Sequence, residues 1–440
     1  MKTSRSRTPP GALEPMQAAF DASVRRLPQL QLQKLIARRS SALGIELKTH
    51  EVEALAKHLL AGNTSPFELE GRPGLKGVTL TFTEEDNAEL TGLADRIKAE
   101  MPRVIEGVTK DASEVLLRRI RKQWPQIRAE HERNRSEFAE TIQLIWGDAL
   151  NKLDMLIATT ESVGGQAVAV ACASRSKKRI ALTTALDRLH VRGIQVASEV
   201  LTLLREGFAD AAFSRWRTLH EISVVAMMLG DHGEELAVRY LDHDVVEAQR
   251  AAEVFQRCHP KEASKRNSVA ELRQTKAEYD AVVAHYGPAF KSPYGWAAKH
   301  LGKEKPTFQH LEEAADQAQM RMQYKVASYG VHAGTKGLTS SVADVFGEGP
   351  PGAASIAGLH EAGIETAYSV VRLTGPLLGP KWSVDKLAGL KTLIKLRDTA
   401  ARAFSQGGRA MSEAAWVSEE EIETWQREAE CSQDVERGED

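Results

Sequence analysis

The sequence predicts an all-α protein. Ala, Leu, Glu, Arg and Lys are abundant, and only 6% of the 440 residues are aromatic, a composition that favours helices over sheets. Apolar residues recur every three or four positions through most of the chain, which is the spacing of amphipathic helices. Only residues 78–82 alternate as a strand does, and an isolated strand is marginal. We therefore expect a multi-helix bundle in which this segment forms a short strand or hairpin, or plain extended chain.

The N-terminal third predicts a smaller helical region. Residues 1–12 are basic and rich in Pro and are expected to be disordered, and residues 13–110 form the helical region. Its first helical stretch covers residues 14–60, with a break at Pro28 because proline lacks the N–H that a helix interior needs. Helix resumes at residues 84–101.

A charged helix is expected to connect this region to the rest of the chain. Residues 111–137 are dense in Arg, Lys and Glu, and Pro125 is expected to break or kink the helix. Because both signs of charge alternate, the pattern favours a solvated connecting helix over a nucleic-acid-binding arm.

The main helical domain is predicted at residues 138–378, followed by a short helical tail at residues 379–440. Gly207 is expected to end one helix, and Asp210 is a suitable N-cap for the next. The expected helices cover residues 138–163, 181–206, 210–229, 234–258, 261–285, 308–333, 362–378, 385–406 and 418–429.

Net charge and cysteine content indicate the cellular compartment and limit the classes of partner. The formal net charge is −2, which argues against a global field for nucleic acid or an anionic membrane. Three widely separated cysteines suit a reducing compartment. The basic N-terminus precedes no apolar signal segment, and the most apolar windows, residues 167–173 and 222–229, are too short to cross a bilayer. We expect a cytoplasmic protein with no membrane partner.

The most informative segment is residues 208–229, where charged side chains enter an apolar helix. Because successive residues advance by about 100° around a helix, Arg217 and Glu221 share a face, His220 lies near it, and Arg215 points the other way. Two interpretations are open. Arg217 and Glu221 form an ion pair that joins helices, or the guanidinium is held for a phosphate or carboxylate.

A second polar face runs along residues 321–335. Tyr324, Ser328 and His332 are spaced by four residues, with Arg321 and Thr335 on the same side. Small residues are expected to let a neighbouring helix approach closely, namely Ala327, Gly330, Ala333 and Gly334. The face is either a satisfied helix interface or the partner of Arg217 and Glu221 in a polar centre.

Residues 239–247 form a third polar cluster. Arg239 shares a face with His243, and Tyr240 shares one with Asp244 and Glu247. The pattern favours a solvated helix over a carboxylate–histidine metal site, because the spacings of metal ligands in helical bundles and zinc sites are absent. The motifs of nucleotide-hydrolysing enzymes, serine hydrolases and kinases are absent as well. We expect neither metal nor cofactor.

Several separated motifs resemble a bacterial family catalogued as domain-of-unknown-function family 5677. They are Trp146-Gly147, residues 199–208, residues 215–221, Arg239-Tyr240, Tyr294-Gly-Trp296 and residues 324–332. The resemblance covers about residues 138–378 and implies an all-helical domain. It assigns no role to any residue.

The segment from Arg215 to His220 is also similar to the Arg-x4-His signature of higher-eukaryote-and-prokaryote nucleotide-binding (HEPN) domains. That similarity implies a metal-independent ribonuclease in which the arginine stabilises phosphorane charge and the histidine moves the proton. In a straight helix, however, the two residues diverge by about 140°. Trp216 also stands where the family has a polar residue.

Two functions follow as hypotheses. One is a non-catalytic helical sensor or assembly module of a bacterial cytoplasmic system, for example in antiphage defence. The alternative is a toxin-like effector, either a metal-independent ribonuclease or a nucleotide-directed enzyme. A homodimer or a partner protein, and RNA or a nucleotide, are the partners considered. The candidate catalytic residues are Arg217, Glu221, His332, His220 and Arg215, and the candidate binding residues are Arg321, Tyr324, Ser328, Tyr240 and Trp296.

Overall fold

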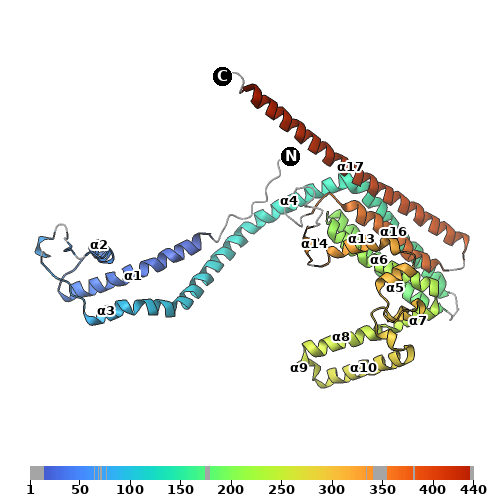
Figure 1. Cartoon of the computed structure of the whole chain (residues 1–440), viewed down its shortest axis with the longest axis horizontal. Coiled ribbons are helices and arrows are strands. Elements are labelled where there is room, and N and C mark those ends of the chain that lie inside the picture. Colours follow the sequence, from blue (N-terminus) through green and yellow to red (C-terminus); the bar gives the residue numbers. More distant parts are fainter. Residues whose placement is uncertain are drawn as a thin grey trace. The chain divides into compact units, whose positions relative to one another are not determined.

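Helices are the regular elements of the part that the computed structural model describes, which is residues 14–63, 65–67, 69, 72–75, 77–173, 179–332, 334–339, 354–379 and 382–436. These residues contain no strand, so the predicted all-α class is confirmed. Residues 78–82 are plain extended chain. The chain divides into two compact units, Met1–Glu132 and Arg133–Asp440, and a long helix, α4, passes from the first into the second (Figure 1).

The first unit has a small core. Its elements are α1 (Glu14–Ala42), α2 (Thr49–Leu60), η1 (Pro73–Leu75), α3 (Glu84–Thr91) and the start of α4 (Leu93–Ala173). Leu32 and Ile36 of α1 pack against Val52 and Ala56 of α2. A core of this size buries little apolar surface, so polar contacts carry more of the packing.

Asp86 fastens α3 to α1. Its carboxylate is fully buried and accepts hydrogen bonds from Arg39 Nε at 2.5 Å and Arg38 Nη2 at 2.6 Å. It also accepts from the backbone N–H of Thr83, which completes a capping box at the start of α3. The hydrogen bond from Arg39 holds the pKa of Asp86 well below its ordinary value.

Three expected helix breaks are absent. Helix α1 continues through Pro28, and α4 continues through Pro125 and through Gly164-Gly165, where the helix predicted at residues 138–163 was to end. The alternative expected at Pro125 was a kink, which a continuous helix does not contradict. Pro28 and Pro125 lie on exposed faces, where water can reach the carbonyl that each proline leaves without a donor. Gly164 serves packing instead, because a Cβ there would meet the His190 ring at 2.2 Å.

The second unit contains the main body. Its elements after α4 are α5 (Ile180–Arg205), α6 (Ala209–His232), α7 (Glu234–Asp242), α8 (Asp244–Cys258), α9 (Pro260–Ala263), α10 (Arg266–Tyr286), η3 (Pro288–Lys291), η4 (Gly295–Ala297), α11 (Ala298–Leu301), α12 (Phe308–Ala314), η5 (Ala318–Met320), α13 (Arg321–Tyr329), α14 (Thr335–Thr339), α16 (Leu359–Leu378) and α17 (Val384–Glu436).

Helix α6 lies at the centre of this unit, packed against α5, α16, α12 and α13 (Figure 1). Trp216, Leu219 and Val224 of α6 are fully buried in one continuous core. Trp146 of α4 meets Phe404 of α17 with ring centroids 6.1 Å apart. The predicted tail therefore contributes to the core, because α17 covers α16 along one side.

Two predicted helices are split. The helix expected at residues 234–258 turns at His243, which separates α7 from α8. The helix expected at residues 308–333 ends at Ala314, because Asp316 adopts a left-handed backbone (φ 53°) and the N–H of Gln317 returns to the carbonyl of Glu312. That geometry is a Schellman-type helix end, which an aspartate tolerates better than most residues.

One apolar stretch is longer than expected from the sequence. Within Met101–Ala173 of α4, an 18-residue window has a mean hydropathy of 1.2, and 28% of that window is buried. By length and composition alone this helix could cross a membrane, and the core helix of a soluble protein passes the same test. Leu156 and Ile157 of α4 are buried in the main core.

Candidate functional site

Helix α6 presents the charged motif from a defined start. Gly207 ends the preceding helix with a left-handed φ of 75°, as predicted, and α6 begins at Ala209. Asp210 lies inside the first turn and Phe208 occupies the N-cap, so the predicted cap was misplaced. From this start, helical periodicity sends Arg217 and Glu221 toward α13 and His220 toward α12.

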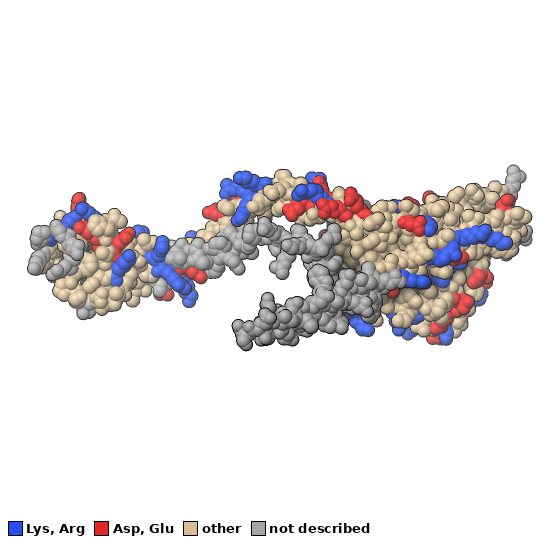
Figure 2. Space-filling view, turned by 90° about the horizontal axis from the view of Figure 1, so that it is seen from above, with Lys and Arg blue, Asp and Glu red and all other residues tan. Residues whose placement is uncertain are grey.

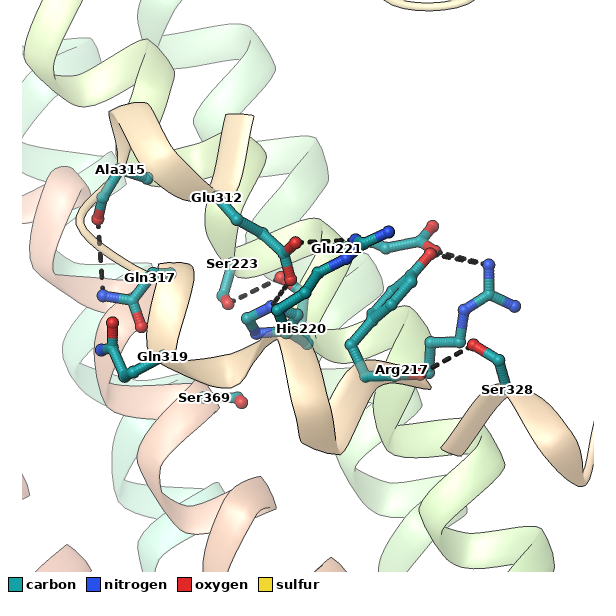
Figure 3. Close-up of polar contacts among 12 residues, drawn as sticks. Arg217, His220, Glu221, Ser223, Glu312, Ala315, Gln317, Gln319, Ser328 and Ser369 are labelled. Atoms are coloured by element: carbon teal, nitrogen blue, oxygen red, sulfur yellow. Dashed lines mark hydrogen bonds and ion pairs between the residues drawn. The ribbon is translucent and has the colours of Figure 1, made fainter. Parts of the chain in front are cut away.

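Arg217 and Glu221 meet across the hydroxyl of Tyr324 (Figure 3). Arg217 Nη2 donates to the hydroxyl at 2.7 Å, and the hydroxyl donates to Glu221 Oε1 at 2.5 Å. The arginine and the glutamate also pair directly at 3.1 Å, and the Arg217 guanidinium lies 4.6 Å from the centroid of the Tyr324 ring. Burial and then the bond to Glu221 raise the pKa of Tyr324, so this hydroxyl stays protonated and acts as a donor.

His220 belongs to a second, sealed network. Its Nε2 lies 3.0 Å from Glu312 Oε1 of α12, and both side chains have no exposed surface. The other carboxylate oxygen of Glu312 accepts from Arg321 Nη1 of α13 at 2.8 Å. A carboxylate only accepts hydrogen bonds, so Nε2 carries the hydrogen of this bond, and the described residues supply no partner for Nδ1.

Aromatic rings enclose the histidine. His220 stacks on Trp216 with centroids 5.4 Å apart, and the edge of Phe308 approaches it at 5.8 Å. Trp216 in turn donates from Nε1 to Ser369 Oγ of α16 at 3.0 Å, with both side chains buried. Trp216 is thus a core residue that ties α6 to α16, and His220 has no route to a substrate phosphate in this conformation.

Arg215 lies on a different side of α6. It forms an ion pair with Glu199 of α5, and Arg192 lies 3.8 Å from the same carboxylate. Arg215 and His220 therefore bond to different helices, α5 and α12. The divergence expected from helical geometry is borne out, and the two groups do not converge on one point within the chain.

The polar face of α13 is shorter than predicted. Ser328 Oγ donates to its own helix, at Tyr324 O, and α13 ends at Tyr329. His332 therefore leaves the helical register and is exposed. It borders a cavity of about 240 Å³ whose other lining residues are Lys325, Ser328, Tyr329, Gly334, Lys336 and Gly337. His332 does not join Arg217 and Glu221.

Small residues of α13 do permit the predicted close approach. The carbonyl of Ala327 accepts from Ser214 Oγ of α6 at 3.1 Å. A Cβ at Gly330 would meet the same Ser214 Oγ at 2.4 Å. Gly334 has open space around it, and Ala333 lies outside the described residues.

The third cluster is solvated in part, because Asp244 and Glu247 are exposed, but Arg239 forms a buried brace. Arg239 is 6% exposed, donates from Nε to the carbonyl of Trp296 at 2.9 Å, and lies over the ring of Tyr286. Tyr240 packs edge-on against Trp296 at 5.1 Å. Burial, followed by the hydrogen bond to Asp242, raises the pKa of Tyr286 to about 12. These contacts hold the 3₁₀ turns η3 and η4 against α7.

Asp244 and Glu247 do not converge with the buried groups of this cluster. His243 Nδ1 and Glu247 lie 3.9 Å apart, while Nε2 bonds to the carbonyl of Ser292. Across the described residues no group of three or more His, Cys, Asp or Glu side chains is placed to hold a metal ion.

The polar centre contains one decisive residue that the sequence analysis missed, Glu312. A signal existed in the sequence. Phe308, Leu311 and Ala315 mark the buried face of α12, and Glu312 falls on that face one turn after Phe308. An acid on an apolar face requires a buried partner, here His220 and Arg321.

The comparisons with known proteins agree with this description and add no activity. Residues 184–349 match the model of a family of unknown function (DUF5677). The match includes α6, α12 and α13, which carry the polar centre. The search of curated proteins found no match, and the search of solved structures found none.

Proposed function

We propose that this chain is a non-catalytic helical module for sensing or assembly, in which the polar centre fixes the packing of α6, α12 and α13. One observation carries the proposal. His220 and Glu312, the groups best suited to proton transfer, are fully buried and bonded to each other. Buried charged networks of this kind specify which helices pack together and in what register.

The remaining candidates support the same proposal. Arg217, Glu221 and Tyr324 bond to one another, Arg215 pairs with Glu199, and the exposed His332 stands apart from all of them. A ribonuclease centre needs an arginine and a histidine within reach of one phosphate. A bacterial cytoplasmic setting such as antiphage defence stays a prediction.

Expression of the full chain in bacterial cells, with RNA integrity and growth as readouts, tests the proposal. Wild type is compared with Arg215→Gln and His332→Ala, two exposed or half-exposed positions whose change leaves the buried network intact. We expect intact RNA and equal growth for all three. RNA cleavage by the wild type that either variant abolishes, at an unchanged melting temperature, would falsify the non-catalytic assignment.

A nucleotide-directed activity is the second candidate, favoured by the two arginines around Tyr324. Arg321 lies 5.0 Å from the ring centroid and Arg217 4.6 Å, and each side chain keeps a quarter or more of its surface exposed. Arginine pairs of this kind bind phosphate. Calorimetric titration of the full chain with nucleoside mono- and triphosphates, repeated with Arg217→Gln, tests this candidate. Heat of binding that the variant loses would support it.

A further inference from the structure

The middle of α4 carries a uniform positive charge, in contrast to the alternation of signs along the whole connecting helix. Residues 115–129 contain five cations and no carboxylate. The cations are Arg118, Arg119, Arg121, Lys122 and Arg128. All five are exposed, and Figure 2 shows a group of Lys and Arg side chains on this stretch of α4. Arg128 forms an ion pair with Glu132, which lies just beyond this stretch, at 2.8 Å.

The same stretch carries an apolar face. At about 100° per residue, one side of the helix, roughly 100° wide, is formed entirely by apolar residues. They are Leu116, Leu117, Ile120, Trp124 and Ile127. Leu117 is 46% exposed, Ile120 54% and Trp124 51%. The five cations lie outside this face and cover the rest of the circumference.

We propose that residues 115–129 form a surface-lying amphipathic helix that docks on an anionic lipid bilayer. A helix with Trp and Leu on one face and Arg and Lys on the other lies in the plane of the interface, with the apolar face among the acyl chains and the cations among the headgroups. The proposal is independent of the function assigned to the polar centre, because residues 115–129 belong to the first unit.

Charge and geometry select the lipid surface over the other occupants. A second copy of this helix, paired through the same apolar face, would bring five more cations alongside those that flank the face, and like charges repel. Single-stranded nucleic acid needs aromatic rings among the cations, where bases stack beside phosphates. Here Trp124 is the one aromatic residue of the stretch, and the other four residues of its face are aliphatic. A helix that lies on the surface needs neither a spanning segment nor a large net charge, the two criteria behind the expectation of no membrane partner.

Co-sedimentation of the full chain with vesicles tests the proposal. The vesicles are phosphatidylcholine alone or an equal mixture with phosphatidylglycerol, each at low and high NaCl. We expect binding to the anionic vesicles only, weakened by salt. The triple variant Arg118→Gln, Arg119→Gln, Arg121→Gln should lower the partition coefficient by roughly 100-fold. Brominated lipid should quench tryptophan emission of the wild type more than that of Trp124→Phe.

The matched control removes three exposed cations elsewhere, with Lys265→Gln at the N-cap of α10 and Arg266→Gln and Arg273→Gln within it. Its partition coefficient should equal that of the wild type. The proposal is overturned if both triple variants lower the partition coefficient equally. Equal binding of the wild type to neutral and anionic vesicles overturns it as well. It is also overturned if the wild type ignores vesicles but binds a single-stranded oligonucleotide, or if it forms a dimer that Ile120→Asp dissociates.

Discussion

Two polar pairs on helix α6 lie only five residues apart along the chain, yet one is partly exposed and the other is buried. Arg215 and Glu199 meet near the surface, with about a third of each side chain exposed. His220 and Glu312 meet with none. Residues 215–220 therefore supply one contact at the surface and one that is fully buried. The difference shows that burial, and not the type of charged residue, decides what each pair contributes to stability and whether it is accessible to a ligand.

The largest effect is expected from Glu312→Leu. The substitution removes the acceptor of both His220 and Arg321 and leaves buried polar groups without a partner, which should lower the free energy of unfolding by about 3–5 kcal/mol. Urea denaturation measures the loss. Glu313→Leu, the exposed neighbour, is the control and should stay within about 0.5 kcal/mol of the wild type. Equal values for the two variants would contradict the sealed network.

His190 extends the comparison to pH. It is 4% exposed, it bonds to Thr374 at 3.3 Å, and burial lowers its pKa to about 4. In the unfolded chain the imidazole of His190 takes up a proton near pH 6.5, whereas in the folded chain it does so only near pH 4. The free energy of unfolding should therefore fall as pH drops from 6.5 to 4, by up to roughly 3 kcal/mol, and should not change on this account above pH 6.5.

Denaturation at several pH values, for the wild type and His190→Gln, isolates this contribution, because other titrating groups are common to both chains. The difference in free energy of unfolding between the wild type and His190→Gln should become smaller as the pH falls from 6.5 to 4. A difference that is constant between pH 4 and 7 would show that His190 does not resist protonation.

A smaller effect is expected from Tyr324→Phe, at the half-exposed side of the same polar centre. The variant deletes the hydroxyl between Arg217 and Glu221, but these two residues can still pair at 3.1 Å. The free energy of unfolding should fall by about 1–2 kcal/mol. Thermal unfolding of Tyr324→Phe is compared with that of Tyr329→Phe, a hydroxyl outside this network. Indistinguishable melting temperatures would mean that the hydroxyl does not contribute to the network.

The smallest effect is expected at the surface pair. A double-mutant cycle with Arg215→Gln and Glu199→Gln should give a coupling energy of about 0–1 kcal/mol, which decreases with salt. If this coupling energy were as large as the loss of unfolding free energy in Glu312→Leu, burial would not distinguish the stabilising effects of the two pairs.

Much of the local structure was accessible from the sequence. The helical class, the end of α5 at Gly207 and the meeting of Arg217 with Glu221 all follow from periodicity within one segment. Helix boundaries were harder to predict. A break was predicted at Pro28 and a break or kink at Pro125, in helices that continue, and the turn at Asp316 was missed because its left-handed residue is not a glycine.

The sequence by itself determined which side chains share a helical face, because hydrogen bonds between residues four apart fix that geometry locally. Only the tertiary structure decided which faces meet. It paired His220 with Glu312, 92 residues away, and Arg215 with Glu199. It also left His332 outside the polar centre, since α13 ends at Tyr329. Partners so far apart in the chain are selected by packing of the whole core, which no local pattern encodes.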